Sequence, residues 1–157
     1  MPDVLKAAHA HRGASFVEIY QNCIVYNDEV FADFTEKQAA GQKQLWLQAG
    51  EKMLFDGGAK GLALDCDRLV LKIVAGDDRS VIVHDPKNRG VAAMLIEMRQ
   101  DEGFPVALGV IYEDPRPTFE SAVMEQNAAA AKGKAADLQA LVSKGQTWMV
   151  EKEPHKL

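Results

Sequence analysis

Hydrophobic and polar residues follow two different periods at the start of the chain, and these periods predict a helix followed by a strand. Residues 2–12 place larger and smaller apolar groups at helical intervals, and Gly13 then provides a good C-terminal stop. Residues 15–20 (SFVEIY) are rich in β-branched and aromatic side chains that alternate along the segment, so we expect a strand there.

A second helix is predicted after a short loop. Asn27 and Asp28 can cap a helix over residues 29–40, with Gly41 as its stop. The result is one strand between two helices, with no sheet partner before it. Because such a strand is a poor start for a doubly wound sheet, we interpret residues 1–42 as the last αβα segment of a larger α/β domain.

The middle of the chain has a different pattern, in which short apolar runs alternate with turn-forming residues. The turn signals are the sequences AGEK, DGGAKG, DCDR and AGDD, all of them rich in Gly, Asp or both. We therefore expect a small, largely antiparallel β unit. Its predicted strands lie at residues 45–47, 53–55, 61–65, 69–74 and 80–84.

The remaining residues return mainly to helical spacing, and they also contain one predicted strand and a second possible one. Pro115 and Pro117 interrupt the chain after the first of these strands. We therefore predict a C-terminal domain over residues 43–115 and a C-terminal helix with a tail over residues 116–157. The expected elements are a helix over 90–101, a strand over 105–112, a helix from 118 to about 144 interrupted at Gly133, and a short strand over 146–150.

Composition narrows the class of protein. The chain has 157 residues, of which 47% are hydrophobic and 26% charged, so it is long enough and apolar enough for a packed core. Its net charge of −5 disfavours binding to nucleic acid and to an anionic membrane surface. No stretch approaches the roughly 18–20 consecutive apolar residues of a spanning helix, and the N-terminus has no apolar signal-peptide core. We expect a cytoplasmic location.

The cysteines are the first candidates for chemistry. The two cysteines, Cys23 and Cys66, are far apart and are expected to be free thiols or metal ligands rather than a disulfide. A lone cysteine after a strand, such as Cys23, is most often a buried small hydrophobe. Cys66 stands between Asp65 and Asp67, where a turn accounts for all three residues better than a metal site does.

The histidines and the glycine-rich segment are weaker candidates for a metal-binding, catalytic or phosphate-binding site. His9 and His11 are two residues apart, so they point to different faces of a helix and make no chelating pair. His84 stands beside Asp85 at the end of a predicted strand, where a turn is the favoured interpretation. The DGGAKG sequence is followed by a β-rich segment rather than a helix, so it predicts a turn and not a phosphate-binding loop.

One segment resembles a known family. Residues 11–28 (HRGASFVEIYQNCIVYND) resemble the stretch H-x-G-x-S-F-[IV]-[ED]-[IV]-x-x-x-C-x-x-x-N of 2-oxoacid:ferredoxin oxidoreductase β subunits. The sequence EIYQNC is most similar to the 2-oxoglutarate branch. Residues 51–65, 81–85 and 105–120 resemble later segments of the same subunits in the same order, although Lys52 replaces a usual Pro and Asp56 a common Gly. The resemblance covers most of residues 4–126.

The resemblance implies a cofactor-dependent enzyme of which this chain holds only a part. Members of the family decarboxylate a 2-oxoacid on thiamin diphosphate, transfer the acyl group to coenzyme A, and pass electrons through a 4Fe-4S cluster to ferredoxin. Thiamin diphosphate and Mg²⁺ are held by motifs of the N-terminal half, which this chain lacks. Cys23 matches the position of the fourth cluster ligand, and no catalytic or cofactor-binding residue is assigned.

The sequence therefore predicts an α/β fold. It would be the C-terminal fragment of a thiamin-diphosphate-binding α/β fold, followed by a small β-rich unit and C-terminal helices. The implied partners are an α subunit, the N-terminal part of the β subunit and ferredoxin, with a 2-oxoacid and coenzyme A as substrates. By itself the chain is expected to be inactive and to bind none of the cofactors.

Two alternatives remain at this point. The chain is either part of the enzyme or a non-catalytic subunit-interaction module from a split or truncated β subunit. A third hypothesis, a thiol-dependent enzyme that uses Cys23, requires nearby cations to lower the thiol pKa. No Lys or Arg lies within ten residues of Cys23, which disfavours it.

Overall fold

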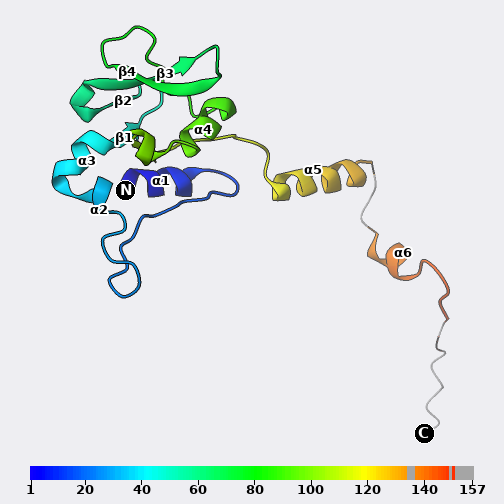
Figure 1. Cartoon of the computed structure of the whole chain (residues 1–157). Coiled ribbons are helices and arrows are strands. Elements are labelled where there is room, and N and C mark those ends of the chain that lie inside the picture. The colour runs from blue at the N-terminus through cyan, green and yellow to red at the C-terminus, as the bar shows by residue number, and fades with distance from the viewer. Residues whose placement is uncertain (134–136, 149, 151–157) are drawn as a thin grey trace. The chain divides into compact units, whose positions relative to one another are not determined.

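The structure is a computed structural model that describes residues 1–133, 137–148 and 150. The chain divides into two compact units, Met1–Arg116 and Pro117–Leu157, which are described separately below (Figure 1). The first unit combines helices with one parallel and one antiparallel sheet. This combination confirms the predicted α/β class.

The antiparallel sheet has three strands in the order β2-β3-β4. β2 is Leu54–Phe55, β3 is Lys60–Asp65 and β4 is Val70–Ala75. Residues 61–63 in the middle of β3 are buried, as the apolar run predicts. The strands expected at 53–55, 61–65 and 69–74 are therefore confirmed.

A tight turn joins β2 to β3, which confirms the interpretation of DGGAKG. A short 3₁₀ helix, η1 (Asp56–Gly58), makes this turn, and Gly57 and Gly58 have φ of 63° and 90°. Gly76 passes so close to the turn that a Cβ atom there would lie 1.9 Å from the Gly58 carbonyl oxygen. Glycine is therefore required at position 76 by the approach of another backbone segment.

The predicted strand over residues 80–84 is wrong. The segment crosses the sheet with only two isolated bridges, between Lys52 and Val83 and between Ala63 and Val81. Asp78 caps its start, because its carboxylate accepts hydrogen bonds from both the amide and the hydroxyl of Ser80. Beyond this turn, Ile82 and His84 make backbone hydrogen bonds to Met53, Leu62, Gly50 and Glu51, but these bonds form isolated bridges and not a continuous strand.

The second sheet corrects the expected topology. β1 (Gln44–Leu47) does not join the antiparallel unit but pairs in parallel with β5 (Val106–Gly109). Parallel neighbours need a long crossover connection. The antiparallel sheet and the helix α4 (Arg89–Ile96) supply this connection.

The core lies between these elements. α4 begins at the cap residue Asn88, whose side chain accepts a hydrogen bond from Val91 N at 3.1 Å. Leu95 is buried, and Met94 and Met98 pack against the core. The buried core residues are Leu45, Leu47, Met53, Phe55, Leu62, Leu71 and Leu95.

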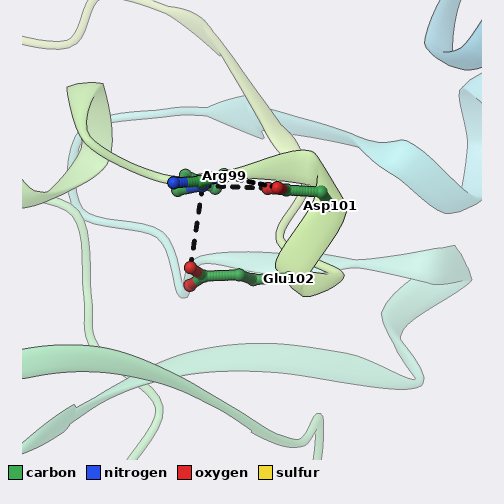
Figure 2. A network of polar contacts seen from close by, with 3 residues as sticks. All are labelled: Arg99, Asp101 and Glu102. Carbon is green, nitrogen blue, oxygen red and sulfur yellow. Dashed lines mark hydrogen bonds and ion pairs between the residues drawn. The ribbon is translucent and has the colours of Figure 1, made fainter.

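An ion-pair network orders the approach to β5 (Figure 2). The helix predicted over 90–101 ends at Ile96, and a separate 3₁₀ helix, η2 (Gln100–Glu102), follows it. Arg99 Nε donates to Asp101 Oδ1 at 3.0 Å and lies 3.6 Å from Glu102 Oε1. The hydrogen bond from Arg99 lowers the pKa of the Asp101 carboxyl. All three side chains are exposed, so the network orders the turn but stabilises the fold little.

The N-terminal part of the first unit departs most from the prediction. The helix predicted over residues 2–12 forms as α1 (Pro2–Ala10) but ends before Gly13, because its C-cap is His11, whose N–H donates to Ala7 O. The strand expected over residues 15–20 is not formed, and the segment is a coil between α1 and α2 in Figure 1. A strand needs a hydrogen-bonding neighbour, and none of the described residues supplies one.

The helix predicted over residues 29–40 is replaced by two shorter helices. They are α2 (Ala32–Thr35) and α3 (Lys37–Lys43), separated by Glu36 in an extended conformation. Asn27 and Asp28 do not cap α2, because its N-cap position is Phe31. Gly41 is not a stop either, since α3 runs through it.

The second unit is helical. α5 (Phe119–Ala131) begins at the predicted residue Thr118, whose hydroxyl accepts a hydrogen bond from Ser121 N at 3.2 Å. The predicted interruption at Gly133 is confirmed, with φ of 78°, and α6 (Leu138–Val142) follows. Within the strand expected over 146–150, residues 146–148 and 150 are not in a strand, and residue 149 lies outside the described part.

Neither unit contains a membrane-spanning segment among the residues that the structure describes. No helix in those ranges has both the length and the apolar character that are needed to cross a bilayer.

Two glycines with opposite surroundings make a stability test. Gly41 is exposed inside α3, and no atom lies within 4 Å of the place that a Cβ would take, so Gly41→Ala should stabilise the fold by about 0.5–1 kcal/mol. Gly76→Ala should instead destabilise it by roughly 2–3 kcal/mol, because the new Cβ meets a backbone oxygen. Urea denaturation of both variants measures the two changes, and equal effects would contradict the structure.

Candidate functional site

Cys23 lies at the start of a tight turn in the coil between α1 and α2. Asn27 N donates to the Cys23 carbonyl oxygen at 2.9 Å, and the two residues form an isolated antiparallel bridge. The turn between them contains Ile24, Val25 and Tyr26. The cysteine therefore stands on a closed backbone loop rather than on a strand or helix.

The thiol of Cys23 is exposed, and its pKa is lowered. Hydrogen bonds from the backbone N–H groups of Tyr26, Val25 and Asn27 lower the pKa of the thiol, while a smaller desolvation effect opposes them. These donors favour the thiolate, the form that binds metals. The buried hydrophobe that a lone cysteine usually represents is not found, because Cys23 is exposed.

Two polar side chains fasten the ends of this loop. Asn22 Nδ2 donates to Asp28 Oδ1 at 2.7 Å, and Asn22 Oδ1 accepts from Glu29 N at 3.0 Å. Glu29 adopts the left-handed region, with φ of 57°, which reverses the chain direction. Asn22 thus orients the loop around Cys23.

An aromatic cluster holds the same loop against α2. The ring of Tyr20 lies edge-on to Phe31 and Phe34, with centroids 5.1 and 5.2 Å apart. Such pairs contribute about 0.5–1.5 kcal/mol beyond the area that they bury. Sequence analysis missed this cluster, although the spacing of Phe31 and Phe34 by three residues is the signal of a shared helix face.

A shallow open cavity of about 230 Å³ lies beside this loop. Glu29 and Glu36 line it together with Asn22 and Thr35. Two carboxylates disfavour an anionic diphosphate, so the cavity does not fit thiamin diphosphate.

The second cysteine lies in the predicted turn. Cys66 is exposed between β3 and β4, and Asp65 Oδ1 accepts hydrogen bonds from the amides of Asp67 and Arg68, each at 3.1 Å. The amide of Arg68, and then that of Asp67, lowers the pKa of the Asp65 carboxyl. The turn interpretation is therefore confirmed.

His84 is a core residue, which its position beside Asp85 did not reveal. The turn predicted at this point is present, because Asp85 Oδ1 accepts a hydrogen bond from Lys87 N at 2.9 Å. The His84 side chain is only 2% exposed, and its Nε2 lies 2.8 Å from the Val110 carbonyl oxygen. Since the carbonyl accepts, Nε2 carries the proton, and Nδ1 finds no partner among the described residues.

The residues of this chain fit one ligand position of an iron–sulfur cluster and not a whole site. A 4Fe-4S cluster takes four cysteine thiolates, and the chain has two cysteines. Among the described residues, no three His, Cys, Asp or Glu side chains gather where they could hold a metal ion. Cys23 fits a single ligand position, because its side chain is exposed and the backbone amides of its turn lower the pKa of its thiol.

Comparison with known proteins gives one informative relative. The chain is 31% identical over 166 residues to 2-oxoglutarate oxidoreductase subunit KorB of Mycobacterium tuberculosis, and the match covers 96% of this chain. This chain is similar to the C-terminal portion of a 2-oxoglutarate oxidoreductase subunit. The comparison confirms the resemblance found in the sequence. The chain spans 42% of the length of this relative.

Two further comparisons gave no match. No family model and no solved structure matches the chain.

The thiol pKa can be tested directly. In a Cys66→Ala variant, the rate of Cys23 alkylation by iodoacetamide should rise with pH around a midpoint below the ordinary value of about 8.5. In urea the turn is lost, so the midpoint should return to that value. Equal midpoints in the folded and unfolded chain would show that the amides do not reach the sulfur.

The lowered pKa of Cys23 also makes the stability of the folded turn depend on pH. Because the folded-state pKa of Cys23 is lowered, the amide hydrogen bonds favour the folded turn at pH values above the unfolded-state pKa. This advantage is lost as the pH falls through the folded-state pKa.

The contact between His84 and Val110 provides a second test. His84→Ala should lower the free energy of unfolding by about 2–4 kcal/mol, because it leaves a cavity and an unpaired carbonyl. The neighbouring Val83 is 50% exposed, so Val83→Ala should cost about 0.5 kcal/mol or less. Chemical denaturation compares the two variants, and similar losses would mean that His84 is not a core residue.

Proposed function

We propose that this chain is part of the β subunit of a 2-oxoacid:ferredoxin oxidoreductase that acts on 2-oxoglutarate. The reaction would be oxidative decarboxylation to succinyl-coenzyme A, with two electrons passed singly through an iron–sulfur cluster to ferredoxin. The observation that carries the proposal is the similarity of nearly the whole chain to the C-terminal portion of a 2-oxoglutarate oxidoreductase subunit.

Cys23 would provide one thiolate of the 4Fe-4S cluster. Its exposed sulfur, its lowered pKa and its amide donors support this role, because hydrogen bonds to the sulfurs help to set a cluster's reduction potential. When bound, the cluster accepts and releases single electrons. Asn22 and Asp28 would keep the Cys23 loop in a fixed conformation, so that the sulfur needs little rearrangement on binding.

The other components would lie outside this chain. Thiamin diphosphate and Mg²⁺ would be held by the N-terminal part of the β subunit, since neither the sequence motifs nor the cavity beside Asn22 fits them. The partners would be that N-terminal part, an α subunit and ferredoxin, and coenzyme A would be the second substrate. The isolated chain would therefore show no turnover.

A second candidate function is a non-catalytic interaction module. The observation that favours it is that the chain spans less than half the length of its relative. Such a module would bind an N-terminal β part or an α subunit without completing a cluster. The two proposals differ in whether the assembly holds iron through Cys23.

Iron and acid-labile sulfide content separates the two candidates. An assembly of this chain with an N-terminal β part and an α subunit should contain about four irons and four sulfides per β subunit. Cys23→Ala should lose most of them, whereas the matched variant Cys66→Ala should keep them. An iron-free assembly that still forms would favour the interaction module, and equal iron in both variants would remove Cys23 from the cluster.

A further inference from the structure

The tip of the Cys23 turn carries three apolar side chains that are largely exposed. Ile24, Val25 and Tyr26, which we call the apolar tip, are 79%, 75% and 91% exposed. Turn residues are ordinarily polar or glycine. A run of consecutive exposed apolar residues is unfavourable in water unless it has a function. The apolar tip therefore needs a role that the turn itself does not supply.

Two hydrogen bonds hold the apolar tip next to the thiol. Asn27 N donates to the Cys23 carbonyl oxygen at 2.9 Å, and Asn22 Nδ2 donates to Asp28 Oδ1 at 2.7 Å just outside this contact. The turn is therefore closed twice at its base. Consecutive Cα atoms lie about 3.8 Å apart, so the first two residues of the tip have their Cα atoms within about 8 Å of that of Cys23. A group bound by the Cys23 sulfur therefore has the apolar tip as its neighbour.

The charged residues nearest to the apolar tip along the chain are acidic. Glu18, Asp28 and Glu29 lie within six residues of Cys23, and no Lys or Arg lies within ten. Carboxylates disfavour a further negative charge on a nearby group, whereas a cation would favour it. A group at the Cys23 sulfur that takes up an electron therefore does so against these charges.

We propose that the apolar tip covers the iron–sulfur cluster held through Cys23, excludes water from it and keeps its reduction potential low. This inference rests on the proposed function, and it names the residues that tune the cluster. A 4Fe-4S cluster with four thiolate ligands becomes more negative when it takes up one electron. Water stabilises the more negative state more strongly, so the exclusion of water lowers the potential. The neighbouring carboxylates act in the same direction.

A different role for the apolar tip would be a contact with another subunit alone. Such a contact would strengthen the assembly and leave the potential of the cluster unchanged. The position of the tip favours the cluster, because its first residue follows Cys23 directly and its last residue precedes Asn27, which closes the turn. The potential of the cluster and the strength of the assembly therefore separate the two roles.

The midpoint reduction potential tests the cover without any need for turnover. The sample is the assembly of this chain with an N-terminal β part and an α subunit, titrated with dithionite and followed by the electron paramagnetic resonance signal of the reduced cluster. The double variant Ile24→Asn/Val25→Asn replaces apolar groups of the tip by amides. At the parent's midpoint potential, this variant should hold on the order of ten times more reduced than oxidised cluster, a shift of about 59 mV to higher potential.

Matched variants make the test specific. Ile24→Leu/Val25→Ile keeps the tip apolar and should keep the parent's potential. Ile96→Asn places the same amide on an isoleucine that is 70% exposed elsewhere in the first unit, and it should also leave the potential unchanged. Release of iron to a water-soluble chelator gives a second measurement, and it should be faster only in the double Asn variant. If that variant loses its iron, Val25→Thr adds a hydroxyl with little change of shape and should raise the potential in the same direction.

Each result decides the inference. A higher potential in the polar variants, with both controls at the parent's value, would support it. Full iron content with an unchanged potential would overturn it and leave the proposed function intact. A weaker assembly whose remaining cluster keeps the parent's potential would also overturn it, because the apolar tip would then be a subunit contact. A parent assembly that forms without iron would reject the proposed function and the inference together.

Discussion

The parallel pairing of β1 with β5 is the constraint on which the first unit depends. It joins Gln44–Leu47 to Val106–Gly109, and everything between these strands is built as their crossover connection. The two strands approach each other closely at the end of the pairing. A Cβ atom at Gly109 would lie only 2.7 Å from the Leu47 carbonyl oxygen. Leu45 and Leu47 on β1 then meet the apolar faces of the antiparallel sheet and of α4 in one core.

The region before β1 is stabilised in a different way. It uses the aromatic cluster of Tyr20, Phe31 and Phe34 and the side-chain bonds of Asn22 in place of a backbone ladder. These contacts hold the ends of the Cys23 turn, whose backbone amides lower the pKa of the Cys23 thiol. They leave residues 12–22 without backbone–backbone hydrogen bonds to the part of the chain that the structure describes.

Local sequence signals predicted the elements whose stabilising contacts are local. β3 and β4 have apolar runs separated by an Asx turn at Asp65, and α5 has a capping threonine, so each was expected at nearly its observed position. Pattern alone did not reveal the partner of β1, because its mate β5 is distant in the sequence and apolar runs do not encode pairing. Likewise, His84 is buried through a carbonyl 26 residues further along the chain.

In the candidate site, too, the sequence predicted some features and left others to be found in the structure. Cys23 was singled out by its motif, whereas the bonds by which Asn22 orients its loop appear only in the structure. The lowering of the thiol pKa depends on the backbone path through Val25 and Tyr26, which no residue type specifies. The strand over residues 15–20 was predicted from its composition but is absent, because composition gives the preference for a strand and not the neighbour that a strand requires.

The most direct test of the central claim is 2-oxoglutarate-dependent reduction of a viologen dye by an assembly of this chain with an N-terminal β part and an α subunit. The account predicts reduction that requires coenzyme A and is abolished by Cys23→Ala but retained in Cys66→Ala. An assembly of normal size that reduces no dye with 2-oxoglutarate, or one whose Cys23→Ala variant works as well as the parent, would contradict it.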